Sequence, residues 1–229
     1  MKNILLLLSL LISGSIAAQS NYEIMNSVNF FSVAKVMKGE TNTELTNEDI
    51  EGSPYLNDEF INGNVYTTSK TMFPDIPLRF NIYNHEIEFK SPEGKIAAID
   101  TPEIVEKIEF GNYVVEYVPY KDVKKIKRSF LLLLSDGHAK LYARPSVDFR
   151  AAEPPVPYKD AVPAKFIDEA TSYYIRVGND AALLIEKKKD LTLAFPDHQH
   201  EIDAFIKKHK INHRKEDKLM ALVEYYNSL

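Results

Sequence analysis

The sequence predicts an α+β protein, in which a mainly antiparallel β-sheet over residues 22–187 is followed by a helical hairpin over residues 188–229. Three observations predict this class. Turn signals containing glycine lie between short apolar runs, apolar and polar residues alternate between the turns, and the apolar period lengthens after residue 187. Successive hairpins of this kind form a meander, which we expect to close as a sandwich or as a curved, partly open barrel.

The first 18 residues have the layout of a secretory signal peptide. Lys2 precedes an apolar stretch from Ile4 to Ile12, and small residues follow as far as Ala18. The apolar stretch is shorter than the roughly 20 residues that a membrane span needs. We therefore expect cleavage near Ala18 and export to the periplasm or beyond the cell. The mature chain is expected to form a single domain over residues 19–229 and not to be an integral membrane protein.

Composition narrows the classes of function. The chain has no cysteine, which excludes disulfides, thiol catalysis, cysteine metal sites and lipid attachment through an N-terminal Cys. Its net charge is −5, with 28 Lys and Arg against 33 Asp and Glu, so nothing electrostatic favours nucleic acid as a partner. The 45% of hydrophobic residues are enough to build a sizeable core.

The predicted hairpins follow the turn dipeptides. In "FLLLLSDGHAKLYA" the turn is Asp136-Gly137, because these residue types accept the positive φ angles of tight turns. Equivalent turns are expected at Asn84-His85, at residues 92–94 and at residues 178–180. In "DEFINGNVYTT" we interpret Asn62-Gly63 as another hairpin turn.

Two acidic residues beside that last dipeptide resemble the start of a calcium loop. The helix-loop-helix calcium motif requires a glutamate six residues after the glycine, and Ser69 stands there. Asp58 and Glu59 are therefore interpreted as part of the approach to a turn.

Alternation identifies the strands between these turns. Leu78, Phe80 and Ile82 fall on one face of a predicted strand, with Arg79 and Asn81 on the other. The wholly apolar run 130–134 predicts a central strand that is covered on both faces.

The stretch "RAAEPPVPYKDAVPAK", residues 150–165, contains four prolines and cannot form a central strand or a helix interior. We expect it to cross the surface in extended form, as a covered connection within the fold. A docking segment for a proline-reading domain is the alternative.

The C-terminal segment has helical periodicity. Ile202, Phe205 and Ile206 share one helical face, and a second stripe is formed by Leu219, Leu222, Val223 and Tyr226. We expect both stripes to pack on the sheet rather than to lie on a membrane.

Residues 52–90 ("GSPYLNDEFINGNVYT…IPLRFNIYNHEIEFK") and the segment from "LLLSDGHAKLYARPSVDFRAAEPPVPYKDAVPAKF" to the closing "FIKKHKI…LVEYYNSL" resemble a widespread set of signal-peptide-bearing envelope proteins of Bacteroidota. The resemblance covers most of the mature chain. It implies export to a bacterial envelope and supplies no activity, ligand or catalytic residue.

Catalytic and metal-binding templates fail at decisive positions. His198 and His200 would lie about 200° apart on a helix, so they do not share a face that could bind zinc or copper. His209 and His213 could meet only if the helix ran beyond Lys210, and Asn212 resembles the cap of the next helix. The two His-Glu pairs that could begin a metalloprotease HExxH motif have Phe89 and Ala204 where the second His belongs.

Nucleophile and nucleotide motifs fail as well. No serine lies in a G-x-S-x-G elbow, and the mature glycines are too far apart for a phosphate loop or a Rossmann fingerprint. The sequence thus predicts no catalytic, cofactor-binding or metal-binding residue.

Charged clusters receive structural interpretations. The carboxylates of Glu86, Glu88, Glu103, Glu106 and Glu109 are expected on a solvated face of the sheet. The basic run "KDVKKIKR", residues 121–128, is expected to guard the following apolar strand against edge pairing, with anionic lipid or polysaccharide as the alternative contact.

The resulting expectation is an exported, non-enzymatic envelope protein that binds a partner or a ligand. One alternative is a carrier that holds an apolar ligand or lipid in a curved-sheet pocket lined by residues such as Phe80, Ile82, Leu132 and Leu134. A weaker alternative is a hydrolase whose carboxylates come together only in space.

Overall fold

The computed structural model describes residues 31–33, 50–122, 125–155, 157–158 and 160–229. The predicted signal peptide and its cleavage site lie outside the described residues.

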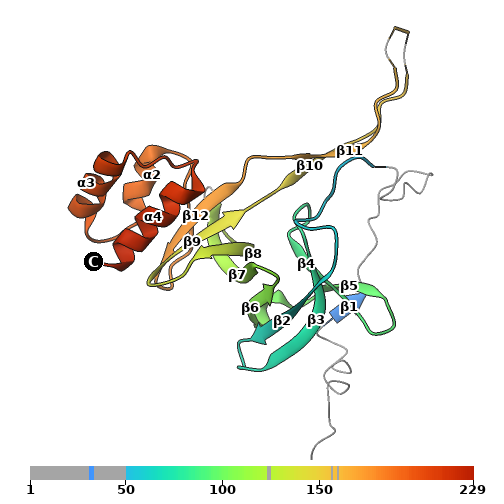
Figure 1. Cartoon of the computed structure of the whole chain (residues 1–229), viewed down its shortest axis with the longest axis horizontal. Coiled ribbons are helices and arrows are strands. Elements are labelled where there is room, and N and C mark those ends of the chain that lie inside the picture. Colours follow the sequence, from blue (N-terminus) through green and yellow to red (C-terminus); the bar gives the residue numbers. More distant parts are fainter. Residues whose placement is uncertain (1–30, 34–49, 123–124, 156, 159) are drawn as a thin grey trace, which may run out of the picture.

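The described residues form an α+β fold, as predicted, in which a mostly antiparallel sheet curls into a half-barrel and carries helices from the C-terminal segment (Figure 1). The eleven-stranded sheet has the order β1-β5-β4-β3-β2-β6-β7-β8-β9-β12-β13. Its strands are β1 (Phe31–Val33), β2 (Ile61–Thr67), β3 (Met72–Asn81), β4 (Glu86–Lys90), β5 (Ile96–Ile99), β6 (Val105–Phe110), β7 (Tyr113–Asp122), β8 (Lys125–Ser135), β9 (Ala139–Arg144), β12 (Ser172–Val177) and β13 (Leu183–Leu184).

The remaining elements are a short hairpin and the helices. β10 (Val147–Arg150) and β11 (Lys165–Asp168) form a separate two-stranded sheet. A 3₁₀ turn, η2 (Pro102–Ile104), precedes β6, and the helices are α2 (Lys188–Leu193), α3 (Gln199–His209) and α4 (Glu216–Asn227). No helix in the described part of the chain combines the length and apolar character needed to cross a membrane.

The second half of the sheet curls until its last segment returns to β7. The Ala182 N–H donates to the carbonyl of Pro119 (2.8 Å), and the Lys121 N–H donates to the carbonyl of Ala182 (2.9 Å). This contact encloses an inner apolar cluster made of Val118, Tyr120, Leu131, Tyr142, Tyr174 and Ala182.

Most predicted turns are confirmed. Residues 136–138 connect β8 to β9, Gly178 (φ 56°) follows β12, and Gly94 (φ 81°) lies between β4 and β5. His85 (φ 58°) closes the β3–β4 hairpin. Glycine at positions 94 and 178 avoids the strain that a side chain would cause in the left-handed region.

The hairpin predicted at Asn62-Gly63 is wrong, because both residues lie inside β2. Gly63 pairs with Ile76 of β3 and with Phe110 of β6, beside a shift in register. A Cβ atom on Gly63 would stand 2.2 Å from the carbonyl oxygen of Glu109. Glycine is needed here for the close approach of two strands rather than for a turn.

The central position predicted for residues 130–134 is confirmed. β8 lies between β7 and β9, and the side chains of Phe130, Leu131 and Leu132 are all buried. Phe130 and Leu132 belong to the sheet cluster, the large apolar core that also contains Val65, Leu78, Phe80, Ile87, Ile108, Phe110 and Val115. Leu131 points to the opposite face and belongs to the inner cluster.

Both predicted helical stripes pack on the sheet. Ile202 and Ile206 of α3, with Leu222 of α4, meet Leu141 of β9 and Ile175 of β12 in one apolar cluster. The side chain of Asn227 fixes the end of α4 by two hydrogen bonds to the backbone of Ala139, at 2.7 and 2.9 Å. The predicted helical hairpin was incomplete, since α2 precedes it.

Candidate interaction arm

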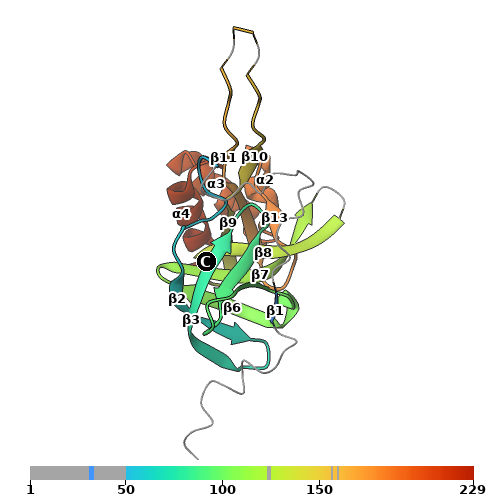
Figure 2. The same cartoon turned by 90° about the vertical axis from the view of Figure 1, so that its right-hand side faces the viewer.

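The proline-rich residues 151–163 extend the β10–β11 hairpin into solvent, and we call them the arm. The ladder begins with Val147 opposite Asp168 and reaches Arg150 opposite Lys165. The same register continues to Glu153 and Val162, which exchange two backbone hydrogen bonds of 2.9 and 3.0 Å. Figures 1 and 2 show the arm pointing away from the sheet and the helices.

The root of the arm is built into the body by an aromatic cluster. The Phe166 side chain is only 8% exposed, and its ring lies 5.4 Å from that of Tyr83 and 5.2 Å from that of Phe149. Tyr83 comes from the β3–β4 hairpin, so the cluster joins the arm to the main sheet. Such ring pairs add to the stabilisation that burial alone provides.

Residues 50–52 add a third backbone segment beside β11. The Glu51 N–H donates to the Ala164 carbonyl (3.0 Å), and the Phe166 N–H donates to the Glu51 carbonyl (2.8 Å). Gly52 (φ 79°) is required because a Cβ atom would lie 2.6 Å from the Phe166 carbonyl oxygen. The root is thus held on both edges of β11 and by its side chains.

Two ionisable residues lie where β9 leads into the arm. Burial, with a smaller contribution from the nearby Arg144 guanidinium, lowers the pKa of His85 to about 4. His85 is consequently uncharged at neutral pH. The positive end of Arg144 lies over the ring of Tyr120, 5.7 Å from its centre.

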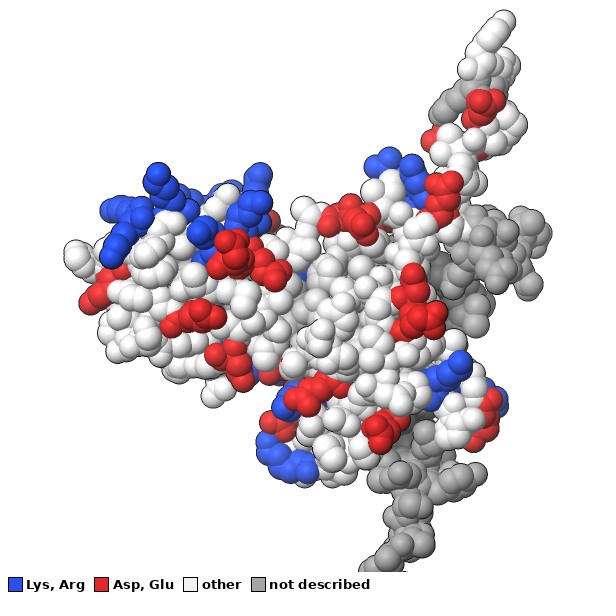
Figure 3. All heavy atoms as spheres, in the orientation of Figure 1, with Lys and Arg blue, Asp and Glu red and all other residues white. Residues whose placement is uncertain are grey.

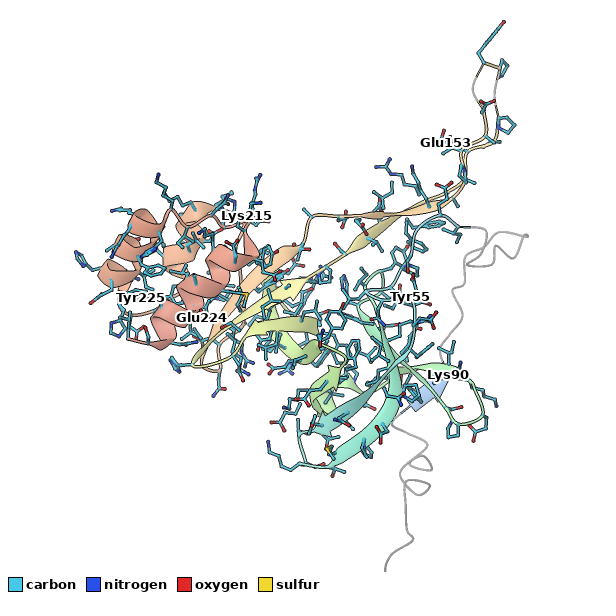
Figure 4. All side chains as sticks on the ribbon, viewed as in Figure 1. Tyr55, Lys90, Glu153, Lys215, Glu224 and Tyr225 are labelled. Atoms are coloured by element: carbon cyan, nitrogen blue, oxygen red, sulfur yellow. The ribbon has the colours of Figure 1, made fainter. Side chains whose placement is uncertain are left out.

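The described residues at the tip of the arm are exposed to solvent. Residues 151–155 are exposed, and the Tyr158 side chain is fully exposed, at 109% of its reference area. Glu153, on the arm, lies far from Lys215 and Tyr225 on the helices (Figure 4). The expectation of an extended path is confirmed. The expected covering is wrong, because among the described residues of this segment those at the root pack against other parts of the fold and those at the tip are exposed.

Prolines make the arm a preorganised segment. Pro154, Pro155, Pro157 and Pro163 restrict the φ angles of residues that make few contacts. A partner that binds such a segment loses less conformational entropy than one that orders a flexible loop. Tyrosine provides a large apolar surface with a hydroxyl, and it is enriched in protein interfaces.

The acidic residues before β2 do not form a cation site. Asp58 and Glu59 lie in bends, and the Ser53 hydroxyl donates to Asp58. The carbonyl oxygen of Asp58 accepts a hydrogen bond from the Arg79 guanidinium (3.1 Å). This segment therefore holds the chain against β3.

The histidines of the helical segment are spread along it. His198 precedes α3, His200 and His209 lie near opposite ends of α3, and His213 lies in the loop before α4. Among the described residues, no group of three or more His, Asp or Glu side chains is placed to hold a metal ion.

Several of the clustered carboxylates are paired with cations. Glu88 binds Arg79 (2.7 Å), and Glu106 binds Lys70 (2.7 Å). Glu109 pairs with Lys107 at 2.6 Å. Burial, with a smaller contribution from Glu88, raises the pKa of Glu86. The Arg79–Glu88 pair joins β3 to β4, whereas Lys107 and Glu109 both lie on β6.

The basic run lies at the far end of the β7–β8 hairpin. Lys125, Lys127 and Arg128 are exposed, and Lys127 pairs with Asp122. The pairing of β8 with β9 begins only at Leu132, so these cations occupy a part of β8 that pairs with β7 alone. Their position fits the interpretation that they discourage pairing with another chain.

The residues suggested as a lipid lining are core residues. Phe80, Ile82 and Leu132 are buried in the sheet cluster, and Leu134 packs against it. Phe80, Ile82 and Leu132 are 0%, 6% and 8% exposed, whereas Leu134 is half-buried.

A buried polar contact that no sequence motif indicates lies between β7 and β9. The Tyr142 hydroxyl donates to Glu116 (2.6 Å), and the Lys140 ammonium donates to the other carboxylate oxygen (2.9 Å). Burial, and then the hydrogen bond to Glu116, raises the pKa of Tyr142. The residues are 24 and 26 positions apart, so only the strand pairing could reveal the contact.

Comparison with protein-family models, with curated proteins and with solved structures finds no match to the chain. The arm is the described feature whose exposure has no explanation within the fold. What it can do chemically is present apolar surface, one phenol and an extended backbone to another molecule.

Proposed function

We propose that this chain is an exported envelope protein that acts as a non-enzymatic binding module and engages a partner protein through its arm. Export is supported by the signal-peptide pattern of residues 1–18 and by the resemblance to envelope proteins of Bacteroidota. Binding is supported by the arm, whose root is packed in the fold while the fully exposed Tyr158 lies at its tip.

The chemistry of the arm favours a protein groove as its partner. Proline-rich extended segments fit shallow grooves lined by aromatic side chains, and they present their backbone carbonyls to hydrogen-bond donors there. The tip is apolar apart from Glu153, Lys159 and Asp160. A small soluble metabolite would gain little from a convex projection, since such ligands are normally enclosed by concave sites.

The test compares the tip with another exposed apolar site. The tip variant is Tyr158→Ala/Pro155→Ala, and the matched control is Met72→Ala/Pro74→Ala, which alters an exposed part of β3. Each protein is tagged, exported in a bacterium that encodes the chain, and isolated from the envelope after mild cross-linking. The cross-linked protein is then purified and its Kd is measured by calorimetry.

We expect one partner to cross-link to the wild type and to the control variant but not to the tip variant. Loss of one well-packed tyrosine at an interface typically weakens binding by about 2 kcal/mol, or about 30-fold. Equal Kd values for all three proteins would contradict the proposal. If the wild type forms a dimer and the tip variant does not, the molecule that binds the arm is a second copy of this chain and not another protein.

A further inference from the structure

A second surface, independent of the arm, carries basic side chains that have no acidic partners. We call residues 187–229, with the three helices, the helical cap. It holds nine Lys and Arg against seven Asp and Glu, so it is basic within a chain of net charge −5. Five cations of the sheet and its turns are paired with carboxylates, for example Arg79 with Glu88 and Lys140 with Glu116.

The cations of the cap are not paired in this way. Among the described residues, Lys218 alone of the nine lies within 4.0 Å of a carboxylate, that of Asp217. The unpaired members are Lys187, Lys188, Lys189, Lys207, Lys208, Lys210, Arg214 and Lys215, all of them exposed.

Three carboxylates of the cap accept hydrogen bonds from uncharged donors. Asp190 accepts the backbone N–H of Lys187 (2.8 Å), and Asp203 accepts the hydroxyl of Thr192 (2.6 Å). Asp197 accepts the hydroxyl of Tyr226. These contacts stabilise the helices and leave the ammonium groups free for other anions.

The basic side chains gather on one side of the cap. Figure 3 shows Lys and Arg atoms concentrated along its upper edge, and Lys215 lies on that edge in the same view (Figure 4). Acidic atoms are spread over the rest of the visible face. A concentrated positive region of this kind attracts multivalent anions more strongly than the same charges dispersed would.

The cap also has an exposed leucine. Leu193, the last residue of α2, is 65% exposed. It stands four residues after Lys189, so the two side chains share one face of the helix. Lysines beside an exposed aliphatic side chain suit a lipid headgroup region, where the cations meet phosphates and the aliphatic group enters the acyl boundary. A soluble polyanion would use the charges alone.

We propose that the helical cap docks the protein on a membrane surface that carries anionic phospholipid headgroups. The lysines of the cap supply the attraction to phosphate, and Leu193 supplies a shallow apolar contact. The apolar stripes of α3 and α4 take no part, because they are buried against β9 and β12.

The experiment is co-sedimentation of the exported, purified chain with phospholipid vesicles. One set contains phosphatidylcholine alone, and the other contains about one third phosphatidylglycerol. The cap variant Lys189→Gln/Lys208→Gln is compared with Lys90→Gln/Lys95→Gln, which removes two exposed lysines from the sheet. Leu193→Ser tests the apolar contact, and circular dichroism verifies that each variant is folded.

We expect wild-type protein to bind the phosphatidylglycerol vesicles and to leave them when salt rises from about 0.1 M to about 0.5 M. The cap variant should bind about tenfold more weakly, and the sheet variant should bind like the wild type. Leu193→Ser should weaken vesicle binding severalfold and leave binding to dextran sulfate unchanged.

Two results would overturn the proposal. Equal binding to both sets of vesicles would show that the cap has no preference for anionic headgroups. Dextran sulfate binding as tight as vesicle binding, with no effect of Leu193→Ser on the vesicles, would assign the surface to a soluble polyanion. Neither result bears on the arm, because all these variants leave residues 151–163 unchanged.

Discussion

Removal of the arm should leave the stability of the fold almost unchanged, whereas removal of one side chain at its root should not. The first perturbation replaces residues 152–163 by Asn-Gly, a pair suited to a two-residue hairpin turn. The register of the ladder places Ala151 opposite Ala164, so the new turn closes the hairpin without changing β10 or β11. The second perturbation is Phe166→Ala.

The magnitudes follow from the contacts of each part. Deletion of the arm removes the two backbone hydrogen bonds between Glu153 and Val162, which stabilise the fold by about 1 kcal/mol each. Shortening the loop from twelve residues to two recovers about 1.6 kcal/mol of closure entropy. The two effects nearly cancel. Phe166→Ala instead opens a cavity between the rings of Tyr83 and Phe149, at a cost of about 3 kcal/mol.

Urea denaturation, followed by far-ultraviolet circular dichroism, measures both changes as free energies of unfolding. The chain has no tryptophan, and its 13 tyrosines offer a second optical probe. We expect the deletion to change the free energy of unfolding by less than about 1 kcal/mol, with an unchanged m-value. A loss of about 3 kcal/mol on deletion would refute the reasoning, because it would mean that the arm supports the body.

Three further predictions concern the body. Gly63→Ala should lower the free energy of unfolding by about 3 kcal/mol, because the new Cβ would lie 2.2 Å from a backbone oxygen. The control Gly94→Ala has no atom within 4 Å of its Cβ but a φ of 81°, and it should cost about 1 kcal/mol. Equal losses in the two denaturation curves would contradict this prediction. Leu222→Ala should cost about 3 kcal/mol in the same assay because that side chain is fully buried under the cap, and a loss below about 1 kcal/mol would show that the cap packs loosely. For His85, the folded pKa of about 4 lies below the unfolded value of 6.5, so the unfolded state binds the proton first, and stability is lost as pH falls from about 6.5 to about 4. Because the ring is partly exposed, we expect the free energy of unfolding of the wild type to fall by about 2 kcal/mol more than that of His85→Asn over that pH range. Asn is chosen because it tolerates the left-handed φ of 58°. Parallel profiles of stability against pH would contradict the assignment.

Local chemistry is what made most of the fold predictable. Asp136-Gly137 and Gly178 are turns because the residues that follow each strand accept positive φ, a property of the residue itself. The apolar stripe of α4 was predictable for a similar reason, since helical periodicity appears in twelve consecutive residues. α2 spans only six residues, too few for the period to stand out.

Errors arose where a distant segment decides the outcome. Asn62-Gly63 has the composition of a turn, but the approach of Glu109 and Phe110 on β6 is what requires glycine at position 63. The return of Ala182 to Pro119 likewise joins residues 63 positions apart, and no local pattern indicates it.

The sequence predicted the extended path of the arm but not its direction relative to the rest of the fold. Four prolines predict an extended segment because they fix φ angles. They do not say whether the segment lies on the body or leaves it. The answer depends on the pairing of β10 with β11 and on the packing of Phe166 against Tyr83, which together anchor the root. Ala164 is buried at this root.

A distance measurement in solution tests most directly whether the arm stands clear of the body. The chain has no cysteine, so spin labels can be attached to Asp160→Cys at the tip and Glu224→Cys on the cap, with Asp148→Cys and Glu224→Cys as the root pair. Double electron–electron resonance should give the tip pair a single narrow distribution at longer distance than that of the root pair. A broad tip distribution that extends below the root distance would show an arm that folds back onto the protein, and the proposed docking role would fail with it.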